Sequence, residues 1–466
     1  MARLDPRTFW RVPLVIVLCA AAATGTYVAA WQTRDSVRQD SVAGIAVPAP
    51  LIAATSVPSG TVAPAAPVPT AVGVAHAIAS ALTNPALGLQ VLARIVDAQT
   101  GAVLYDHLGA TPGAPASTAK ILTAAAILTV HPASYRFTTV VRAAGGTVYL
   151  VGGGDPTLTA APPGQSGPYP GAARLSTLAA QLRAGKVPVS RIVVDDALFA
   201  GPTISPDWMP EDVPSSYESA ITATMTDGGR AAPGDAIRSS TPDLSAGQEL
   251  AAALGRPGLP VARGKAPAGA PVVAQVASAP LSIMIEQMLH ESDNVIAEVL
   301  ARQVAVAEHT PATFLGAASA VRAVLEKLGA DVGSGMRDGS GLAAADRIAP
   351  ASLVAVLRLV SGNLPAGAKT APVTQASTLI AALPVAGWSG TLATRYVSGA
   401  AATAAGDVRA KTGSIDGVTT LAGYVHDRSG RLLVFSLDAD RTPSGGTHAA
   451  EQALDRIVGA LATCGC

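Results

Sequence analysis

Three short strings in the sequence carry residue types that together could perform acyl transfer. In chain order they are Ser117-Thr118-Ala119-Lys120, Ser292-Asp293-Asn294 and Lys411-Thr412-Gly413. They supply a hydroxyl nucleophile, an amine that can act as a base, a second hydroxyl that can relay a proton, and a cation that can anchor an anion. This ordered set is typical of serine acyl-transfer enzymes.

The composition makes a chance match of all three strings improbable, although each string alone indicates little. Lys120 is the one lysine with a serine three positions before it, and Lys411 is the one that opens a Lys-Thr-Gly string. A second Ser-x-Asn exists at Ser361-Gly362-Asn363, where it predicts the end of a helix. Ser117 alone would be interpreted as a helix cap. The ordered set of three favours a catalytic interpretation.

The first two strings can assemble a nucleophile and its base. Residues three apart share a helix face, so Ser117 and Lys120 can meet. A serine hydroxyl is a poor nucleophile until a base takes its proton. Lys120 can be that base only when neutral, and burial beside Lys411 would lower its pKa. Ser292 can bridge Lys120 and a leaving amine, while Asn294 offers a donor and an acceptor to a substrate amide.

The third string predicts a strand edge that receives the substrate. Lys411 suits a substrate carboxylate, Thr412 adds a hydroxyl, and Gly413 permits close approach of a substrate backbone. The backbone N–H groups of Ser117 and Ser414 would then form an oxyanion hole. None of the seven histidines is expected to be the base, and no His-Glu-x-x-His string supports a zinc protease.

These residues need a sheet and a helix to bring them together. We expect strands near 89–96 and 102–105, a helix over 116–129, three further strands at 408–412, 419–426 and 431–438, and a closing helix over 448–461. The five strands would form one antiparallel sheet, with the nucleophile helix beside the strand that carries Lys411. The 175 positions between Ser117 and Ser292 leave room for an inserted domain.

The predicted organisation has four parts. Residues 1–34 are a signal peptide or a membrane anchor, because three arginines precede an uncharged run of about 20 residues. Residues 35–70 are rich in alanine and proline and predict a disordered linker. Residues 71–147 and 276–466 form the catalytic domain, and 148–275 form the inserted domain. We slightly favour an uncleaved anchor, and in either case an extracytoplasmic location.

The composition excludes several functions. The 32 basic and 32 acidic residues balance, and aromatic residues make up 4% of the chain. This gives neither a basic track nor stacking platforms for nucleic acid. We expect no cofactor and no metal. Cys464 and Cys466 cannot complete a tetrahedral zinc site, so they are expected to be inert or disulfide-bonded.

With these residues identified, the chain resembles the D-alanyl-D-alanine carboxypeptidase/endopeptidase family of class C low-molecular-mass penicillin-binding proteins. The resemblance covers about residues 89–460. Besides the three strings, it is carried by the stretches 115–124, 152–158, 292–298, 338–342, 387–392 and 410–414.

The resemblance implies an α/β (α+β) fold of the penicillin-binding transpeptidase and β-lactamase type, with an antiparallel sheet between helices. It also implies that Ser117 is acylated by peptidoglycan stem peptides with release of the terminal D-Ala, that cross-links are a further substrate, and that β-lactams trap the same serine. Many members carry two inserted domains. Here the stretch 228–240 is short, so we expect one.

Two alternatives remain open at this stage. A β-lactamase would use the same acylation residues, but neither Glu298 nor Glu326 lies in a suitable Glu-x-x-Leu-Asn string for activating the deacylating water. A catalytically silent wall-binding protein would not need the complete set of residues. An adduct on Ser117 with penicillin would separate the enzyme from the silent protein.

Overall fold

The computed structural model describes residues 66–362 and 375–466. The predicted targeting segment (1–34) and nearly all of the predicted linker lie outside the described residues. Residues 66–466 form one compact unit. In the described ranges, no helix has both the length and the apolar character needed to cross a membrane.

The first of two sheets joins the two ends of the described chain. Its five strands lie in the order β2 (Val103–His107), β1 (Gln90–Asp97), β10 (Leu432–Asp440), β9 (Val418–His426) and β8 (Val408–Ile415). Every neighbouring pair is antiparallel. The sequence-based prediction of a front hairpin joined to a C-terminal meander is therefore confirmed. Strand β8, which carries the third string, lies at one edge.

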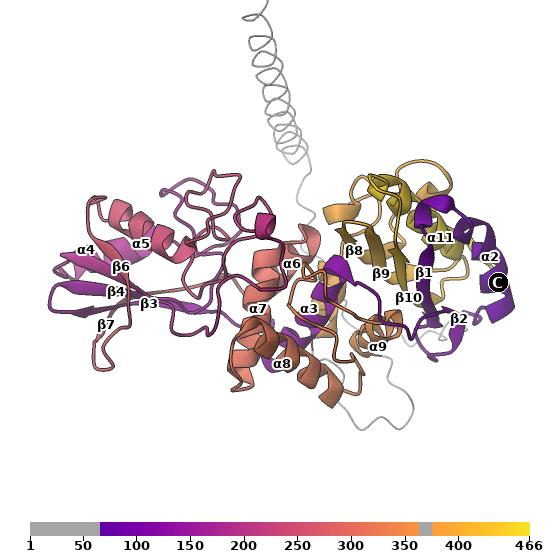
Figure 1. Cartoon of the computed structure of the whole chain (residues 1–466), viewed down its shortest axis with the longest axis horizontal. Helices are drawn as coiled ribbons and strands as arrows, with labels where there is room; N and C mark the ends of the chain where they lie inside the picture. The colour runs from indigo at the N-terminus through magenta and orange to yellow at the C-terminus, as the bar shows by residue number, and fades with distance from the viewer. Residues whose placement is uncertain (1–65, 363–374) are drawn as a thin grey trace, which may run out of the picture. The chain divides into compact units, whose positions relative to one another are not determined.

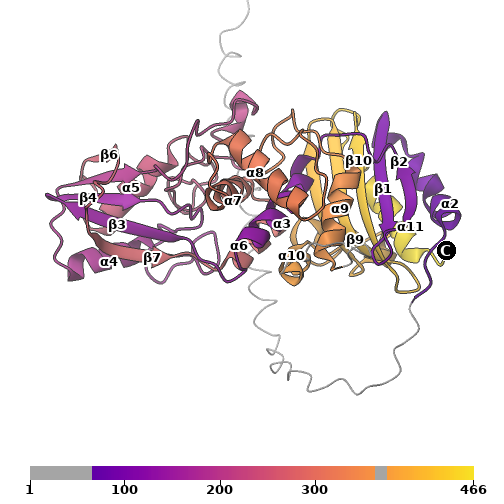
Figure 2. The same ribbon diagram turned by 90° about the horizontal axis from the view of Figure 1, so that it is seen from below.

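Helices cover both faces of this sheet, as Figure 2 shows. On one face lie α2 (Ala71–Leu82) and α11 (Thr447–Thr463), and on the other lie α3 (Lys120–Val130) and α9 (Pro350–Val360). The period of two along β9 explains the two layers, because alternate side chains point to opposite faces. Leu421 and Val425 join the cluster under α11, whereas Ala422 and Tyr424 join the cluster around α3. The predicted α/β fold is confirmed.

Helix α3 is the centre of the larger hydrophobic cluster. All its residues from Lys120 to Leu128 are buried, and a helix that is buried on every side must be surrounded by other elements. These are mainly helices. The surrounding helices are α6 (Leu281–His290), α7 (Asn294–Ala307), α8 (Phe314–Lys327), α9 and α10 (Ala376–Ala382).

A second five-stranded sheet is formed by the segment 138–277 (Figure 1). Its order is β6 (Val261–Arg263), β5 (Arg191–Asp195), β4 (Thr147–Val151), β3 (Thr138–Ala144) and β7 (Val272–Ala277), and it packs against α4 (Leu175–Ala184) and α5 (Pro242–Ala253). The β3–β4 hairpin belongs wholly to this sheet. The expected start of the inserted domain at 148 falls inside β4, and β3 was not expected.

Within the described ranges, five short 3₁₀ helices complete the secondary structure. They are η2 (Pro85–Leu87), η3 (Ala116–Ala119), η4 (Pro210–Asp212), η5 (Gly390–Leu392) and η6 (Ala400–Ala404). Two of them, η3 and η5, contact strand β8 and bring parts of the candidate site to the sheet edge.

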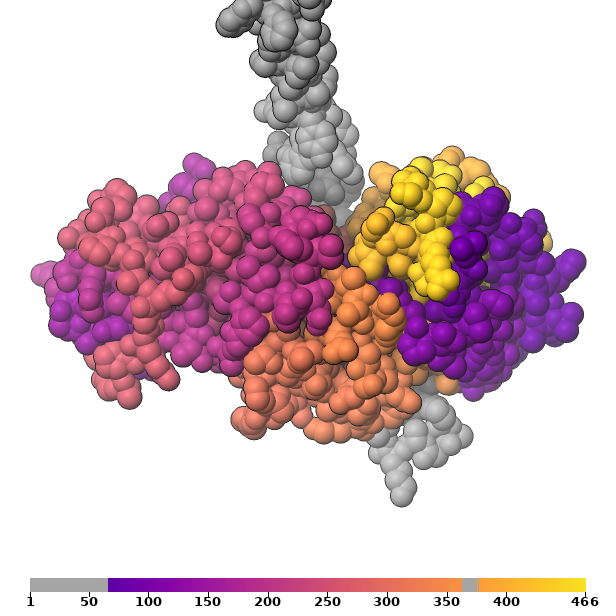
Figure 3. Space-filling view, viewed as in Figure 1, coloured from indigo at the N-terminus to yellow at the C-terminus, as the bar shows by residue number. Residues whose placement is uncertain are grey.

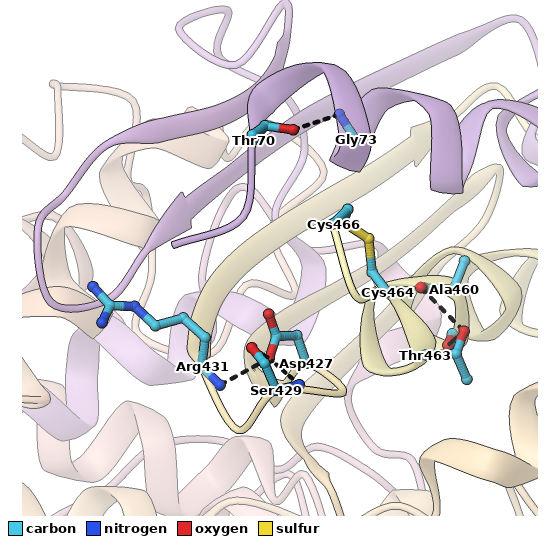
Figure 4. The surroundings of a disulfide bond; sticks show 10 residues. Thr70, Gly73, Asp427, Ser429, Arg431, Ala460, Thr463, Cys464 and Cys466 are labelled. Carbon is cyan, nitrogen blue, oxygen red and sulfur yellow. Dashed lines mark hydrogen bonds between the residues drawn. A yellow bond between two sulfur atoms is a disulfide. The ribbon is translucent and has the colours of Figure 1, made fainter. Parts of the chain in front are cut away.

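The start and the end of the described chain lie side by side. In Figure 3 the indigo surface of the first residues runs without a break into the yellow surface of the C-terminal residues. Cys464 and Cys466 form a disulfide, which was one of the two expected states. Figure 4 shows Cys466 beside the first turn of α2, where the Thr70 N–H donates to the Cys466 carbonyl at 2.8 Å.

Candidate active site

Ser117 lies in a tight turn at the start of the nucleophile helix. The sequence predicted one helix over 116–129, but residues Ala116–Ala119 form the 3₁₀ helix η3 and the α-helix α3 starts at Lys120. Ala116 has a φ of 44°, a left-handed conformation that costs energy for a residue with a Cβ and that is often found at functional sites. The turn leaves Ser117 half-buried and keeps it within reach of Lys120.

The Lys120 side-chain nitrogen has three oxygen neighbours. Its Nζ lies 2.7 Å from Ser117 Oγ, 2.6 Å from Asn294 Oδ1 and 2.9 Å from the Ser340 carbonyl oxygen. The first two contacts join the first and second strings, which are 174 positions apart between Lys120 and Asn294. The predicted meeting of Ser117 and Lys120 is present in the structure.

Burial changes the acidity of Lys120. The side chain is 0% exposed, and this loss of solvent lowers its pKa from 10.5 to about 8, against the opposing charges of nearby carboxylates. The carboxylates that raise the pKa belong to Asp338, Glu218, Glu298 and Asp293. A lysine with a pKa near 8 is neutral in a useful fraction of molecules at neutral pH.

The second string forms the short connection between α6 and α7. Ser292 has a φ of 56°, and Asn294 is the first residue of α7. Lys411 Nζ donates to Ser292 Oγ at 2.9 Å. Ser292 therefore faces the third string, while Asn294 faces Lys120, and the connection links the two lysines.

Lys411 is fully enclosed. Its side chain is 0% exposed, and its ammonium also donates to the Thr412 carbonyl at 2.7 Å. Burial lowers its pKa well below the ordinary value, and the nearby positive charge of Lys120 lowers it further. The side-chain nitrogen of Lys411 therefore already donates to two internal acceptors. This does not favour the expectation that it binds a substrate carboxylate directly.

Gly413 permits contact between β8 and the nucleophile turn. A Cβ built on it would collide first with Thr420 Oγ1, which donates to the Pro115 carbonyl at the start of the turn, and would lie 2.9 Å from the Ser117 nitrogen and 3.0 Å from Ala116 Cβ. The glycine was expected to admit the substrate backbone, but the structure gives a more immediate need, which is to admit η3. The other two residues of this edge differ in exposure. Thr412 is buried and its Oγ1 donates to Thr391 Oγ1 at 2.8 Å, whereas Ser414 is exposed.

Sequence reasoning missed the residues that hold the 338–343 loop. Asp338 accepts backbone hydrogen bonds from Ser340, Gly341 and Ala343, and it accepts one from Trp208 Nε1 at 2.8 Å. Glu298 accepts the Gly339 N–H. This loop presents the Ser340 carbonyl to Lys120. The only signal in the sequence was the glycine-rich string 338–342, which carried no assignment of its own.

The role of Asp293 was also missed. Its Oδ1 accepts the Ile296 N–H at 3.0 Å and so caps α7. Its carboxylate also accepts hydrogen bonds from Tyr169 and Arg238, which come from the segment 138–277. An aspartate before a helix could have been identified as a cap, but no local pattern indicated the tyrosine or the arginine.

The site has the features of acid–base chemistry on hydroxyl groups. Within residues 66–362 and 375–466, no group of three or more His, Cys, Asp or Glu side chains is placed to hold a metal ion. The groups that converge are two hydroxyls, two buried amines and one amide. They can deprotonate one hydroxyl and move a proton to a second.

Comparison with known proteins gives a family match over most of the chain. The family model described as the D-Ala-D-Ala carboxypeptidase 3 (S13) family matches residues 74–234 and 231–463. Carboxypeptidase DacB of Mycolicibacterium smegmatis is 43% identical over 410 residues, which is 86% of each chain. A carboxypeptidase of Mycobacterium tuberculosis is 40% identical over 469 residues, 98% of this chain and 99% of the relative.

The fold also matches a solved structure. Penicillin binding protein 4 of Haemophilus influenzae superposes with a TM-score of 0.68 and 21% sequence identity, covering 81% of this chain and 97% of that chain. At this identity the likeness concerns the fold alone.

Proposed function

Since the chain belongs to the D-Ala-D-Ala carboxypeptidase 3 (S13) family, and is therefore a serine-type D-Ala-D-Ala carboxypeptidase, we propose that Ser117 is its nucleophile and Lys120 the base. The substrate is a peptidoglycan stem peptide that ends in D-Ala-D-Ala. The terminal D-Ala is released by hydrolysis through an acyl-enzyme.

The observation that carries this assignment is the set of partners around Lys120 Nζ. A neutral amine has two N–H donors and one lone pair. Asn294 Oδ1 and the Ser340 carbonyl accept the two N–H bonds, at 2.6 and 2.9 Å. The lone pair is then left for the third neighbour, the Ser117 hydroxyl at 2.7 Å. In the neutral form, which burial favours, the lone pair is aimed at the proton that must be removed.

The reaction then proceeds in two steps. Ser117 Oγ attacks the carbonyl carbon of the penultimate D-Ala while its proton passes to Lys120. The oxyanion is held by the backbone N–H groups of Ser117 and Ser414. The proton moves through Ser292 to the leaving amine as the C–N bond breaks, and an ester remains on Ser117. Water, deprotonated by the same base, hydrolyses the ester.

The enclosure of Lys411 refines its role. Its Nζ donates to Ser292 Oγ and to the Thr412 carbonyl, so it acts on the proton relay. Direct contact with the substrate carboxylate falls to hydroxyl groups on the same strand edge, of which that of Ser414 is exposed. Thr412 and Gly413 complete the edge, the latter by admitting the nucleophile turn.

Three finer points extend the proposal. We propose that the enzyme also cuts D-alanyl cross-links and that β-lactams acylate Ser117. We propose that residues 1–34 direct the chain to the extracytoplasmic face of the cell envelope, as a signal peptide or as a membrane anchor. We also propose that residues 138–277 form the inserted domain, with its boundary before β3 rather than at 148.

The test uses the chain from residue 66 with a labelled penicillin and with a D-Ala-D-Ala pentapeptide. Peptide mass spectrometry is expected to find the adduct on Ser117, and D-Ala release is expected to disappear in Ser117→Ala. An adduct on another residue would refute the nucleophile assignment. The absence of any adduct would also refute it and would favour the alternative of a catalytically silent wall-binding protein. Rapid turnover of the penicillin without D-Ala release would favour the β-lactamase.

A further inference from the structure

We propose that Arg238 and Tyr169 are positioning residues for the reaction. They hold the carboxylate of Asp293, and through it they fix Ser292 and Asn294, which flank Asp293 in the chain. Both residues belong to the segment 138–277, so this segment takes part in building the active site. The inference rests on the function proposed above for Ser292 and Asn294.

The contacts at Asp293 satisfy its carboxylate almost completely. Arg238 Nη2 donates to Oδ2 at 2.8 Å and Nη1 donates to Oδ1 at 3.3 Å. The Tyr169 hydroxyl donates to Oδ2 at 2.8 Å. The side chains of Arg238 and Asp293 are 5% and 6% exposed. A two-pronged guanidinium contact fixes the orientation of a carboxylate as well as its position.

The carboxylate transmits this orientation to the site through the backbone. Asp293 Oδ1 also accepts the Ile296 N–H at the start of α7. The residue before it, Ser292, has the left-handed φ of 56°, which persists only where the surroundings determine it. The residue after it, Asn294, must keep its position, because its Oδ1 accepts a hydrogen bond from Lys120. Rotation of the Asp293 backbone would move both functional side chains.

A second contact from the same segment supports the interpretation independently. Trp208 Nε1 donates to Asp338 Oδ2 at 2.8 Å, and Trp208 is buried. Asp338 organises the loop whose Ser340 carbonyl accepts from Lys120. The segment 138–277 therefore contacts both loops that position the partners of Lys120.

The chain offers a matched control in a second buried arginine–aspartate pair. Arg431 donates through Nε and Nη2 to the Asp97 carboxylate, the latter at 2.8 Å, and the two side chains are 8% and 0% exposed. This pair joins the β9–β10 turn to the end of β1 and touches none of the three strings. Loss of either arginine leaves one buried carboxylate without its cation, so a purely structural role predicts a loss of thermal stability in both variants and no selective loss of acylation in one.

The experiment compares Arg238→Ala, Arg238→Lys, Tyr169→Phe and Arg431→Ala. Each is measured for its second-order rate of acylation by a fluorescent penicillin and for thermal unfolding. Misplacement of catalytic groups by about 1 Å can cost about 10²-fold in rate. We expect a loss of that order in Arg238→Ala, partial recovery in Arg238→Lys, a smaller loss in Tyr169→Phe, and a rate within about threefold of wild type in Arg431→Ala.

The pH profile adds a readout that a structural role would not move. Burial alone would raise the pKa of Asp293, but the charge and hydrogen bonds of Arg238 lower it to about 2. The groups that face this carboxylate are Arg238, Tyr169, Glu218 and Lys120. Without Arg238 the pKa must rise, so acylation by Arg238→Ala should fall more steeply toward acid pH than that of the wild type.

Equal acylation rates for Arg238→Ala and Arg431→Ala, with wild-type pH profiles, would overturn the inference. Should Arg238→Ala fail to fold, a Tyr169→Phe variant with the wild-type rate, together with an Arg238→Lys variant with the wild-type rate, would overturn it equally. A failure of the proposed function can be distinguished from a failure of this inference, because the Ser117→Ala variant would then still be acylated.

Discussion

At the scale of single residues, the environment of Lys120 determines how activity depends on pH. Burial brings its pKa from 10.5 to about 8, and only the neutral amine can take the Ser117 proton. Below pH 8 each unit of acidification lowers the neutral fraction about tenfold. The acylation rate is therefore predicted to rise with pH and to level off above about 8, and Lys120→Ala should lose about 10²–10⁴-fold.

The sequence predicted the residues that lie in recognisable strings and missed those that lie alone. Ser117, Lys120 and Asn294 meet around one nitrogen, and Ser292 meets Lys411. Their spacing within each string was sufficient to identify them, while their roles stay proposals.

The supporting residues are isolated in sequence and could not be found in this way. Tyr169 and Arg238 reach Asp293 from two separate connections outside the helices and strands, and Trp208 reaches Asp338 over 130 positions. Such long-range hydrogen bonds leave no local periodicity. The sequence likewise did not predict that Lys411 is buried, because a strand-edge pattern does not indicate burial.

At the scale of secondary-structure elements, the packing of η3 on β8 sets the nucleophile. We predict that Gly413→Ala keeps the fold but reduces acylation by about 10²-fold, because the new Cβ would collide with Thr420 Oγ1, which binds the Pro115 carbonyl, and would lie 2.9 Å from the Ser117 nitrogen. The measurement is the acylation rate with a labelled penicillin, alongside circular dichroism.

The control for this substitution is Gly258→Ala. A Cβ at Gly258 meets nothing within 4 Å, and its φ is not in the left-handed region, so its rate should equal that of the wild type. A Gly413→Ala variant with the same rate as Gly258→Ala would show that the close approach of η3 and β8 does not matter for the reaction.

Most elements were predicted because their patterns are strong. The front hairpin, the C-terminal meander and α11 were expected close to their observed bounds. The turn η3 was predicted as a regular helix because tertiary packing on β8, not local propensity, imposes the left-handed Ala116. Strand β3 was missed, although it pairs with its neighbour β4, and its second partner β7 lies far along the chain.

At the scale of the whole molecule, the C-terminal disulfide lies where the predicted linker meets the body. The Thr70 N–H donates to the Cys466 carbonyl, and a Cβ on Gly73 would lie 2.5 Å from Cys466 Cβ. The two cysteines are two positions apart. A cross-link over so short a loop constrains the unfolded chain little, roughly 1–2 kcal/mol in the chain-entropy account.

We therefore predict that the double variant Cys464→Ser, Cys466→Ser melts only a few degrees below the wild type and acylates at the wild-type rate. Thermal unfolding and acylation are measured with and without a reductant, which should affect the wild type alone. A large loss of acylation would indicate that the paired ends of the chain support the site, contrary to this account.

The most direct test of the central claim is the second-order rate of Ser117 acylation measured from pH 5.5 to 9.5. If neutral Lys120 primes the serine, the logarithm of the rate rises with a slope near one up to about pH 8 and then levels off. A rate that is flat across this range, or that is unchanged in Lys120→Ala, would contradict the account.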